Sequence, residues 1–114
     1  MDAVLGAAGM DDIGALFPDD DPAWEGASSI VLLAEVVARV RVAGWTVVNV
    51  DVTVVCERPR LAPYRAAMRT RLAAALGVSE SQVGVKATTT EGMGFTGRGE
   101  GVAATAVCLL EPAD

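Results

Sequence analysis

The sequence predicts a single α/β (α+β) domain, residues 1–114, in which a small β-sheet carries helices on one face only. Three segments repeat apolar residues with helical spacing and three with strand spacing, in the order helix, helix, strand, helix, strand, strand. The chain has 114 residues, of which 52% are hydrophobic and 21% charged, which suits one folded core. Because three helices cannot cover both faces of a sheet, we expect the uncovered face to pack against other copies of the chain.

The first two helices are predicted in the N-terminal part of the chain. Residues 1–10 form a short helix that ends near Gly9. A polar connector, DDIGALFPDDDP, follows, because its two prolines and three consecutive aspartates disfavour helix. The second helix begins at a serine cap, Ser28 or Ser29, and continues to about Ala43, where a glycine closes it.

The remaining elements alternate strand and helix. The clearest strand, TVVNVDVTVVCE, covers Thr46–Glu57, with one face apolar and the other mixed. A third helix starts at Pro63 and ends at Gly77, with apolar residues at every fourth position. Two more strands, Gln82–Thr90 and Gly101–Leu110, are joined by a glycine-rich loop.

Composition excludes several classes of function. The net charge of −6 argues against nucleic acid or an anionic membrane surface as the main partner. No apolar run approaches the roughly 18 residues of a membrane span, and no signal peptide is recognised, so a cytoplasmic location is expected. The chain has no histidine, the commonest zinc ligand and general base. Cys56 and Cys108 are expected to be free thiols.

Three stretches could carry chemistry. KATTTEGMGFTGRGEG, residues 86–101, is either a hairpin turn or a loop whose backbone N–H groups and threonine hydroxyls hold phosphate oxygens. If the loop holds phosphate, Arg98 adds a positive charge and Glu91 adds a carboxylate ligand for Mg²⁺. The acidic connector is a solvated turn or a binding segment, and it lacks the spacing of a calcium loop. CERPRLAP follows a strand, where α/β folds often bind ligands.

Taken together, DDIGALFPDDDP, NVDVTVVCERPRLAP and VKATTTEGMGFTGRGEGVA resemble the signatures of the 2-C-methyl-D-erythritol 2,4-cyclodiphosphate synthase family. The similarity is collinear from Asp2 to Leu110. It implies a homotrimer whose sheets face inward, with each active site between two neighbouring subunits. The implied activity is an intramolecular phosphoryl transfer in non-mevalonate isoprenoid biosynthesis. It converts 4-diphosphocytidyl-2-C-methyl-D-erythritol 2-phosphate to the cyclic diphosphate and releases CMP, which makes the enzyme a phosphorus–oxygen lyase.

The resemblance also implies a role for each matching residue. The methylerythritol part contacts the first stretch, the cytidine lies against the second, and the threonines of the third hold the phosphates. Thr89 stabilises the transition state and Glu91 binds Mg²⁺ (or Mn²⁺). A structural role for Arg98, pairing with Glu100 or another acid, stays open. The implied substrate-binding residues are Asp12, Ile13, Gly14, Phe17, Pro18, Asp19, Asp20, Asp21, Cys56, Glu57, Arg58, Pro59, Arg60, Leu61, Ala62, Thr88, Thr89, Thr90, Glu91, Phe95 and Arg98.

The chain departs from the family pattern at its start. Family members begin further upstream, with a strand that carries an Asp-x-His pair and a later histidine, and these residues supply the zinc ligands. None of these ligands is present in the 114 residues, although Zn²⁺ is expected for the family. We therefore expect one of two alternatives. The first is an enzyme whose start has been misplaced or whose chain is a fragment. The second is a catalytically inactive trimeric remnant that binds cytidine nucleotides and Mg²⁺.

Overall fold

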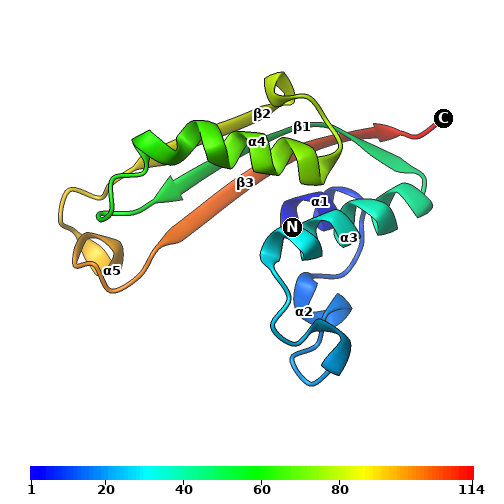
Figure 1. The fold of residues 1–114 in the computed structure, drawn as a ribbon, viewed down its shortest axis with the longest axis horizontal. Coiled ribbons are helices and arrows are strands. Elements are labelled where there is room, and N and C mark those ends of the chain that lie inside the picture. Colours follow the sequence, from blue (N-terminus) through cyan, green and yellow to red (C-terminus); the bar gives the residue numbers. More distant parts are fainter.

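A mixed three-stranded sheet in the order β2-β1-β3 is the centre of the fold in the computed structural model, which describes residues 1–114 (Figure 1). Its strands are β1 (Trp45–Val55), β2 (Val83–Thr88) and β3 (Ala103–Pro112). β1 pairs parallel with β2 and antiparallel with β3. β2 and β3, consecutive along the chain, are therefore not neighbours but flank β1. The glycine-rich loop between them crosses the end of β1, so the hairpin alternative for this loop is wrong.

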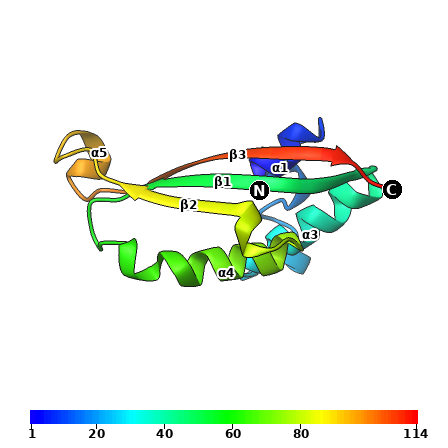
Figure 2. The same ribbon diagram turned by 90° about the horizontal axis from the view of Figure 1, so that it is seen from above.

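The helices lie on one face of the sheet and beside one of its edges, so they leave the other face uncovered (Figure 1, Figure 2). In the edge-on view α3 and α4 lie against the same face (Figure 2), and α1 lies beside β3 at the edge of the sheet (Figure 1). The helices are α1 (Asp2–Ala7), α2 (Ile13–Leu16), α3 (Ser29–Val42), α4 (Arg65–Leu76) and α5 (Gly94–Gly97), with short 3-10 turns at Pro22–Trp24, Ala62–Tyr64 and Glu80–Gln82.

The predicted caps of the long helices are confirmed. The Ser28 hydroxyl accepts a hydrogen bond from the Ile30 N–H at 3.2 Å, which satisfies one of the free N–H groups at the start of α3. At the end of α4, Gly77 takes the left-handed conformation, with φ 71°, that a residue with a side chain adopts only at a cost. Local sequence chemistry therefore determines the start of α3 and the end of α4. The predicted start of α4 at Pro63 is wrong by two residues, because Pro63 lies in the 3-10 turn Ala62–Tyr64 and α4 begins at Arg65.

Several predicted boundaries differ from the structure. The strand expected over Gln82–Thr90 ends at Thr88, because the backbone turns and Glu91 adopts a φ of 54°. The strand expected to run to Glu57 ends at Val55. The acidic connector contains the short helix α2, which the sequence pattern did not predict. The Asp12 carboxylate starts it by accepting the Ala15 N–H at 3.0 Å. The glycine-rich loop contains the equally unexpected α5.

The core lies between the sheet and its helix layer. It contains 13 buried residues, of which Leu5, Val36 and Val40 are at most 1% exposed. An irregularity in the pairing of β1 with β3 falls between Val47 and Asn49. Val47 is therefore buried beside the core together with Val50, although strict alternation would place these two residues on opposite faces of the sheet.

The uncovered face of the sheet is more polar than the expected lining of valine and threonine. Val107 and Leu109 are 69% and 56% exposed, which agrees with apolar surface left without a cover. In the middle of the face, however, the Lys86 ammonium group donates to the Asp51 carboxylate at 2.6 Å. Asp51 lies opposite Gly84, where a Cβ atom would approach Asp51 Oδ1 to 2.6 Å. A glycine at this position therefore leaves room for the ion pair.

Two further expectations can be compared with the structure. No helix is both long and apolar enough to cross a membrane. Both cysteines are free, as expected, with Cys56 buried and Cys108 half-buried.

Candidate functional site

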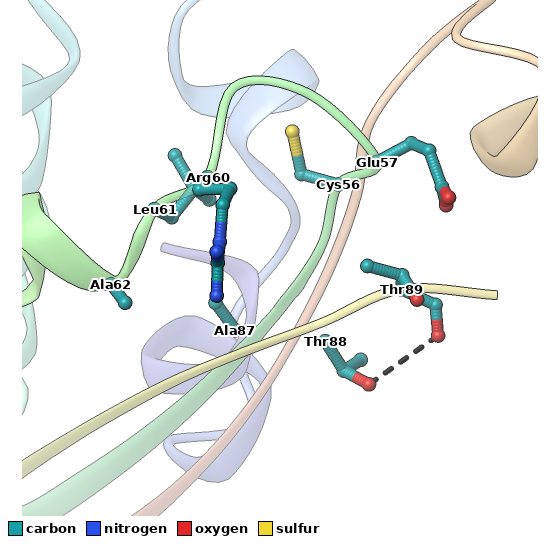
Figure 3. Close-up of a pocket in the computed structure, with 8 residues that line it drawn as sticks. All are labelled: Cys56, Glu57, Arg60, Leu61, Ala62, Ala87, Thr88 and Thr89. Carbon is teal, nitrogen blue, oxygen red and sulfur yellow. Dashed lines mark hydrogen bonds between the residues drawn. The ribbon is translucent and has the colours of Figure 1, made fainter. Parts of the chain in front are cut away.

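A pocket lies at the carboxyl ends of the two parallel strands, β1 and β2 (Figure 3). Because parallel strands end at the same edge of a sheet, the loop after β1 and the threonines at the end of β2 meet there. The Cys56 N–H extends the strand pairing by donating to the Thr88 carbonyl at 3.0 Å. The pocket has a volume of about 170 Å³ and is lined by Cys56, Glu57, Arg60, Leu61, Ala62, Ala87, Thr88 and Thr89.

The loop after β1 is shaped by its own backbone and by one buried thiol. The Cys56 thiol donates to the Arg58 carbonyl at 3.1 Å, which folds the chain back on itself. The peptide bond between Arg58 and Pro59 is cis, and Leu61 leads into the 3-10 turn before α4. The pocket wall consequently combines backbone groups and small side chains with the longer side chains of Glu57, Arg60 and Leu61, a mixed polar and apolar lining that suits a flat, polar ring.

The threonines at the end of β2 and directly after it divide into two groups. Thr88 and Thr89 line the pocket, and the Thr89 hydroxyl accepts the Glu91 N–H at 3.2 Å, which leaves its proton available to a ligand. The Thr90 hydroxyl instead donates to the Met93 carbonyl at 2.5 Å and lies 3.0 Å from the hydroxyl of buried Thr96. In this structure Thr90 therefore holds the loop together.

The glycine-rich loop folds tightly on itself. A Cβ atom at Gly97 would lie 2.2 Å from the Gly92 carbonyl carbon, so only glycine permits this approach of two backbone segments. The Phe95 ring lies against Gly101 and is 50% exposed. Compact packing of glycine backbone gives the loop a defined shape at the end of the sheet.

Arg98 forms an ion pair within the same loop. Its Nε and Nη2 atoms donate to the two carboxylate oxygens of Glu100, each at 3.0 Å. The pairing with Glu100 that the sequence left open is therefore present in the structure.

The residues of this chain suit one of the two expected metal ions, Mg²⁺ and Zn²⁺, but not the other. Glu91 is an exposed carboxylate beside the Thr89 hydroxyl, and a single carboxylate together with substrate phosphates is a common way to bind Mg²⁺. These residues fit Mg²⁺. Zn²⁺ sites need several clustered ligands, and the 114 residues contain no group of three or more His, Cys, Asp or Glu side chains placed to hold a metal ion. The residues present do not fit Zn²⁺.

The acidic connector lies far from this pocket in the same chain. Figure 1 shows α2 and its flanking loops below α3, well apart from α5 and the loop after β1. Its predicted site residues also serve the fold: the Asp21 carboxylate caps the turn after it by accepting the Ala23 N–H at 3.0 Å. The buried Phe17 ring packs edge-on against Trp24 with ring centroids 4.8 Å apart. One chain therefore brings together the second and third sequence stretches but not the first.

Sequence reasoning missed one residue of the pocket, Ala87. The signal was available, since strand alternation places Ala87 on the same face as the buried Val83 and Val85. Its position next to the first threonine identifies it as part of the pocket wall.

Comparison with known proteins identifies relatives of both sequence and fold. The YgbB family model matches residues 1–111. The 2-C-methyl-D-erythritol 2,4-cyclodiphosphate synthase of Azoarcus sp. (strain BH72) is 57% identical over 113 residues, which cover 99% of this chain and 70% of the relative. The bifunctional enzyme IspD/IspF of Anaeromyxobacter sp. (strain Fw109-5) is 60% identical over 96% of this chain. The chain spans only 28% of that relative's length.

Solved structures agree in fold. The bifunctional IspDF from Campylobacter jejuni superimposes with a TM-score of 0.94 at 42% identity, over 99% of this chain and 31% of that one. A 2C-methyl-D-erythritol-2,4-cyclodiphosphate synthase in its CDP-bound form gives a TM-score of 0.88 at 35% identity, over 96% of this chain and 71% of that one.

Proposed function

The chain belongs to the YgbB family of 2-C-methyl-D-erythritol 2,4-cyclodiphosphate synthases, and from this premise we propose that it carries the nucleotide-binding half of such an enzyme's active site. The reaction is the intramolecular phosphoryl transfer that forms the cyclic diphosphate from 4-diphosphocytidyl-2-C-methyl-D-erythritol 2-phosphate and releases CMP, a step of non-mevalonate isoprenoid biosynthesis. The substrate class is thus a cytidine diphosphate-linked small molecule.

One observation carries the proposal. Two segments that are separate in sequence line one pocket at the ends of two parallel strands: Thr88–Thr89, and the loop after β1 through Cys56, Glu57, Arg60, Leu61 and Ala62. A pocket of about 170 Å³ with a mixed polar and apolar lining suits a single pyrimidine ring, and the adjacent hydroxyls suit the phosphates attached to it. A structurally similar enzyme of the family has been solved in its CDP-bound form.

The proposed chemistry depends on positioning. The phosphoryl group moves within one molecule, so the protein needs to hold the two reacting phosphates together and balance their charge. Thr89 has a hydroxyl proton free to donate to a phosphate oxygen where charge develops. Mg²⁺ at Glu91 neutralises phosphate charge when it is bound. No step is assigned to Zn²⁺, because the residues of this chain do not fit it.

We further propose that the acidic connector completes the site across an interface between two copies in a homotrimer. The connector and the pocket lie well apart in one chain, so one molecule cannot close both around the same ligand (Figure 1). The exposed Val107 and Leu109 supply apolar surface on the uncovered sheet face for such an assembly. Phe17–Asp21 of one copy then covers the methylerythritol part of a ligand whose base lies in the neighbour's pocket.

Calorimetry with CDP tests the binding half of the proposal. We expect CDP to bind more tightly with Mg²⁺ than without, and Glu91→Gln to remove that difference while leaving the fold intact. Thr89→Val should weaken binding by about 1 kcal/mol, since one hydrogen bond to the ligand is lost. The matched control is Thr105→Val on β3, outside the pocket, which should leave CDP affinity unchanged. Equal CDP affinities for all variants with and without Mg²⁺ would contradict the proposal.

An assay of CMP release from the substrate tests the catalytic half. Release by the 114-residue protein supports the synthase activity for the chain itself. Binding of CDP without release supports the second candidate, a nucleotide-binding subunit. The observation that favours this candidate is that the described residues do not fit the Zn²⁺ expected for the family.

A further inference from the structure

Glu57 forms part of two cavities at once. It lines the nucleotide pocket at the ends of β1 and β2, and it also lines a second cavity of about 320 Å³ between the loop after β1 and the glycine-rich loop. The other residues of the second cavity are Arg58, Gly97, Arg98 and Gly99. Figure 3 shows the Glu57 side chain pointing away from Arg60 and Leu61, on the opposite side of Cys56. Glu57 is therefore the side chain that links the pocket to the glycine-rich loop.

The carboxylate of Glu57 lacks a partner. Its Oε2 atom is buried and accepts no hydrogen bond. A buried carboxylate oxygen without a donor is costly, so folded proteins usually supply one. Every other residue of the second cavity is an arginine or a glycine, so its walls offer two guanidinium groups and backbone N–H groups. The cavity therefore offers Glu57 two kinds of donor: Arg58 on its own loop, and Arg98 with the backbone N–H groups on the glycine-rich loop.

The Arg98 guanidinium group has N–H groups that Glu100 does not engage. A guanidinium group carries five N–H bonds, and Glu100 engages one on Nε and one on Nη2. The two N–H bonds of Nη1 and the second one of Nη2 stay free, so Arg98 can keep Glu100 and still has N–H groups to donate to a second carboxylate. The Arg98–Glu100 pair is more than half exposed, and such pairs resist rearrangement only weakly.

We propose that Glu57 is a positioning residue that accepts an N–H group of Arg98 across this cavity and thereby holds the glycine-rich loop against the nucleotide pocket. With Glu57 on one side and Glu100 on the other, the guanidinium group of Arg98 is held from two sides. It also fixes the backbone of Gly97 and Gly99, which lie on either side of Arg98. The effect of Glu57 on ligand binding rests on the proposed function, whereas the Glu57–Arg98 contact itself does not.

The contact is tested without ligand by a double-mutant cycle. We expect the effects of Glu57→Ala and Arg98→Ala on urea unfolding to be non-additive, because each removes the same contact. The matched cycle of Glu57→Ala with Arg58→Ala uses the other arginine of the cavity and should be additive. Additive effects in the first cycle, or coupling only in the second, would overturn the assignment of Arg98.

A CDP titration tests the positioning role. Glu57→Ala should weaken CDP binding about tenfold, as expected for loss of a charge-assisted hydrogen bond. Glu57→Gln keeps an accepting oxygen and should recover part of that loss, which a purely steric role would not predict. If CDP binds and Glu57→Ala leaves its affinity unchanged, the inference is wrong and the proposed function stands. If wild-type protein binds no CDP but Glu57 and Arg98 are coupled in unfolding, the proposed function fails and the contact stands.

Discussion

Replacement of Gly97 by alanine is expected to open the glycine-rich loop. The added Cβ atom would lie 2.2 Å from the Gly92 carbonyl carbon and 2.8 Å from the Gly92 Cα and O atoms. Ordinary van der Waals contact begins at 3.4 Å, so the two backbone segments must separate by 1.2 Å, the difference between these distances. Because the obstacle is backbone, which cannot move aside as a flexible side chain can, we expect a cost of about 3 kcal/mol.

Separation of Gly92 from Gly97 also breaks the hydrogen bonds that shape the loop. The Gly97 N–H donates to the Met93 carbonyl at 3.1 Å, and the hydroxyls of Thr90 and Thr96 lie 3.0 Å apart. If the loop contributes to diphosphate binding, a loss of about 3 kcal/mol corresponds to CDP affinity more than a hundredfold lower. Amide hydrogen exchange should become faster in the loop while the core of the sheet stays protected.

Gly99→Ala is the matched control within the same loop. Gly99 has a φ of +73° but no atom within 4 Å of its added Cβ, so alanine there meets only a conformational cost of about 1 kcal/mol. Gly97 lacks a positive φ, so its cost is steric alone. Urea unfolding, hydrogen exchange and CDP calorimetry on both variants separate the two effects. Equal behaviour of the two variants would show that the close approach at Gly97 does not govern the loop.

Three further predictions concern the core, the uncovered face and the pH dependence of stability. Leu5→Ala should lower the free energy of unfolding by about 3–5 kcal/mol in urea titrations, because Leu5 is 0% exposed, whereas Val42→Ala, at a position 90% exposed, should change it little. Val107→Glu should convert a trimer into monomers in light scattering, and a wild-type monomer at micromolar concentration would contradict the proposed assembly. Burial raises the pKa of the Cys108 thiol, so its stabilising contribution is complete below the pKa of the unfolded thiol and is lost as pH rises through the folded value. Alkaline urea titrations should show stability falling less steeply above about pH 8.5 in Cys108→Ala than in wild type.

The sequence predicts local structure well where short-range chemistry decides it. Ser28 and Gly77 mark the ends of helices because a hydroxyl cap and a left-handed glycine act within one turn of the chain. The alternation of valine with polar residues predicts β1 for the same reason, since the pleat repeats every two residues. The sequence pattern does not predict the short helices α2 and α5, because four residues are too few to show a helical period.

The sequence also identifies candidate site residues, but not which of them meet. The motifs that resemble the synthase family identify the threonines, the loop after β1 and the acidic connector as functional candidates. Only the tertiary structure decides that β2 and β3 flank β1, because strand order depends on pairing between distant segments. That order places the glycine-rich loop across the end of β1 and gives Glu57 its second cavity. The tertiary structure also keeps the acidic connector apart from the pocket (Figure 1). Contacts between residues far apart in the chain depend on how the core packs as a whole, and no local pattern encodes them.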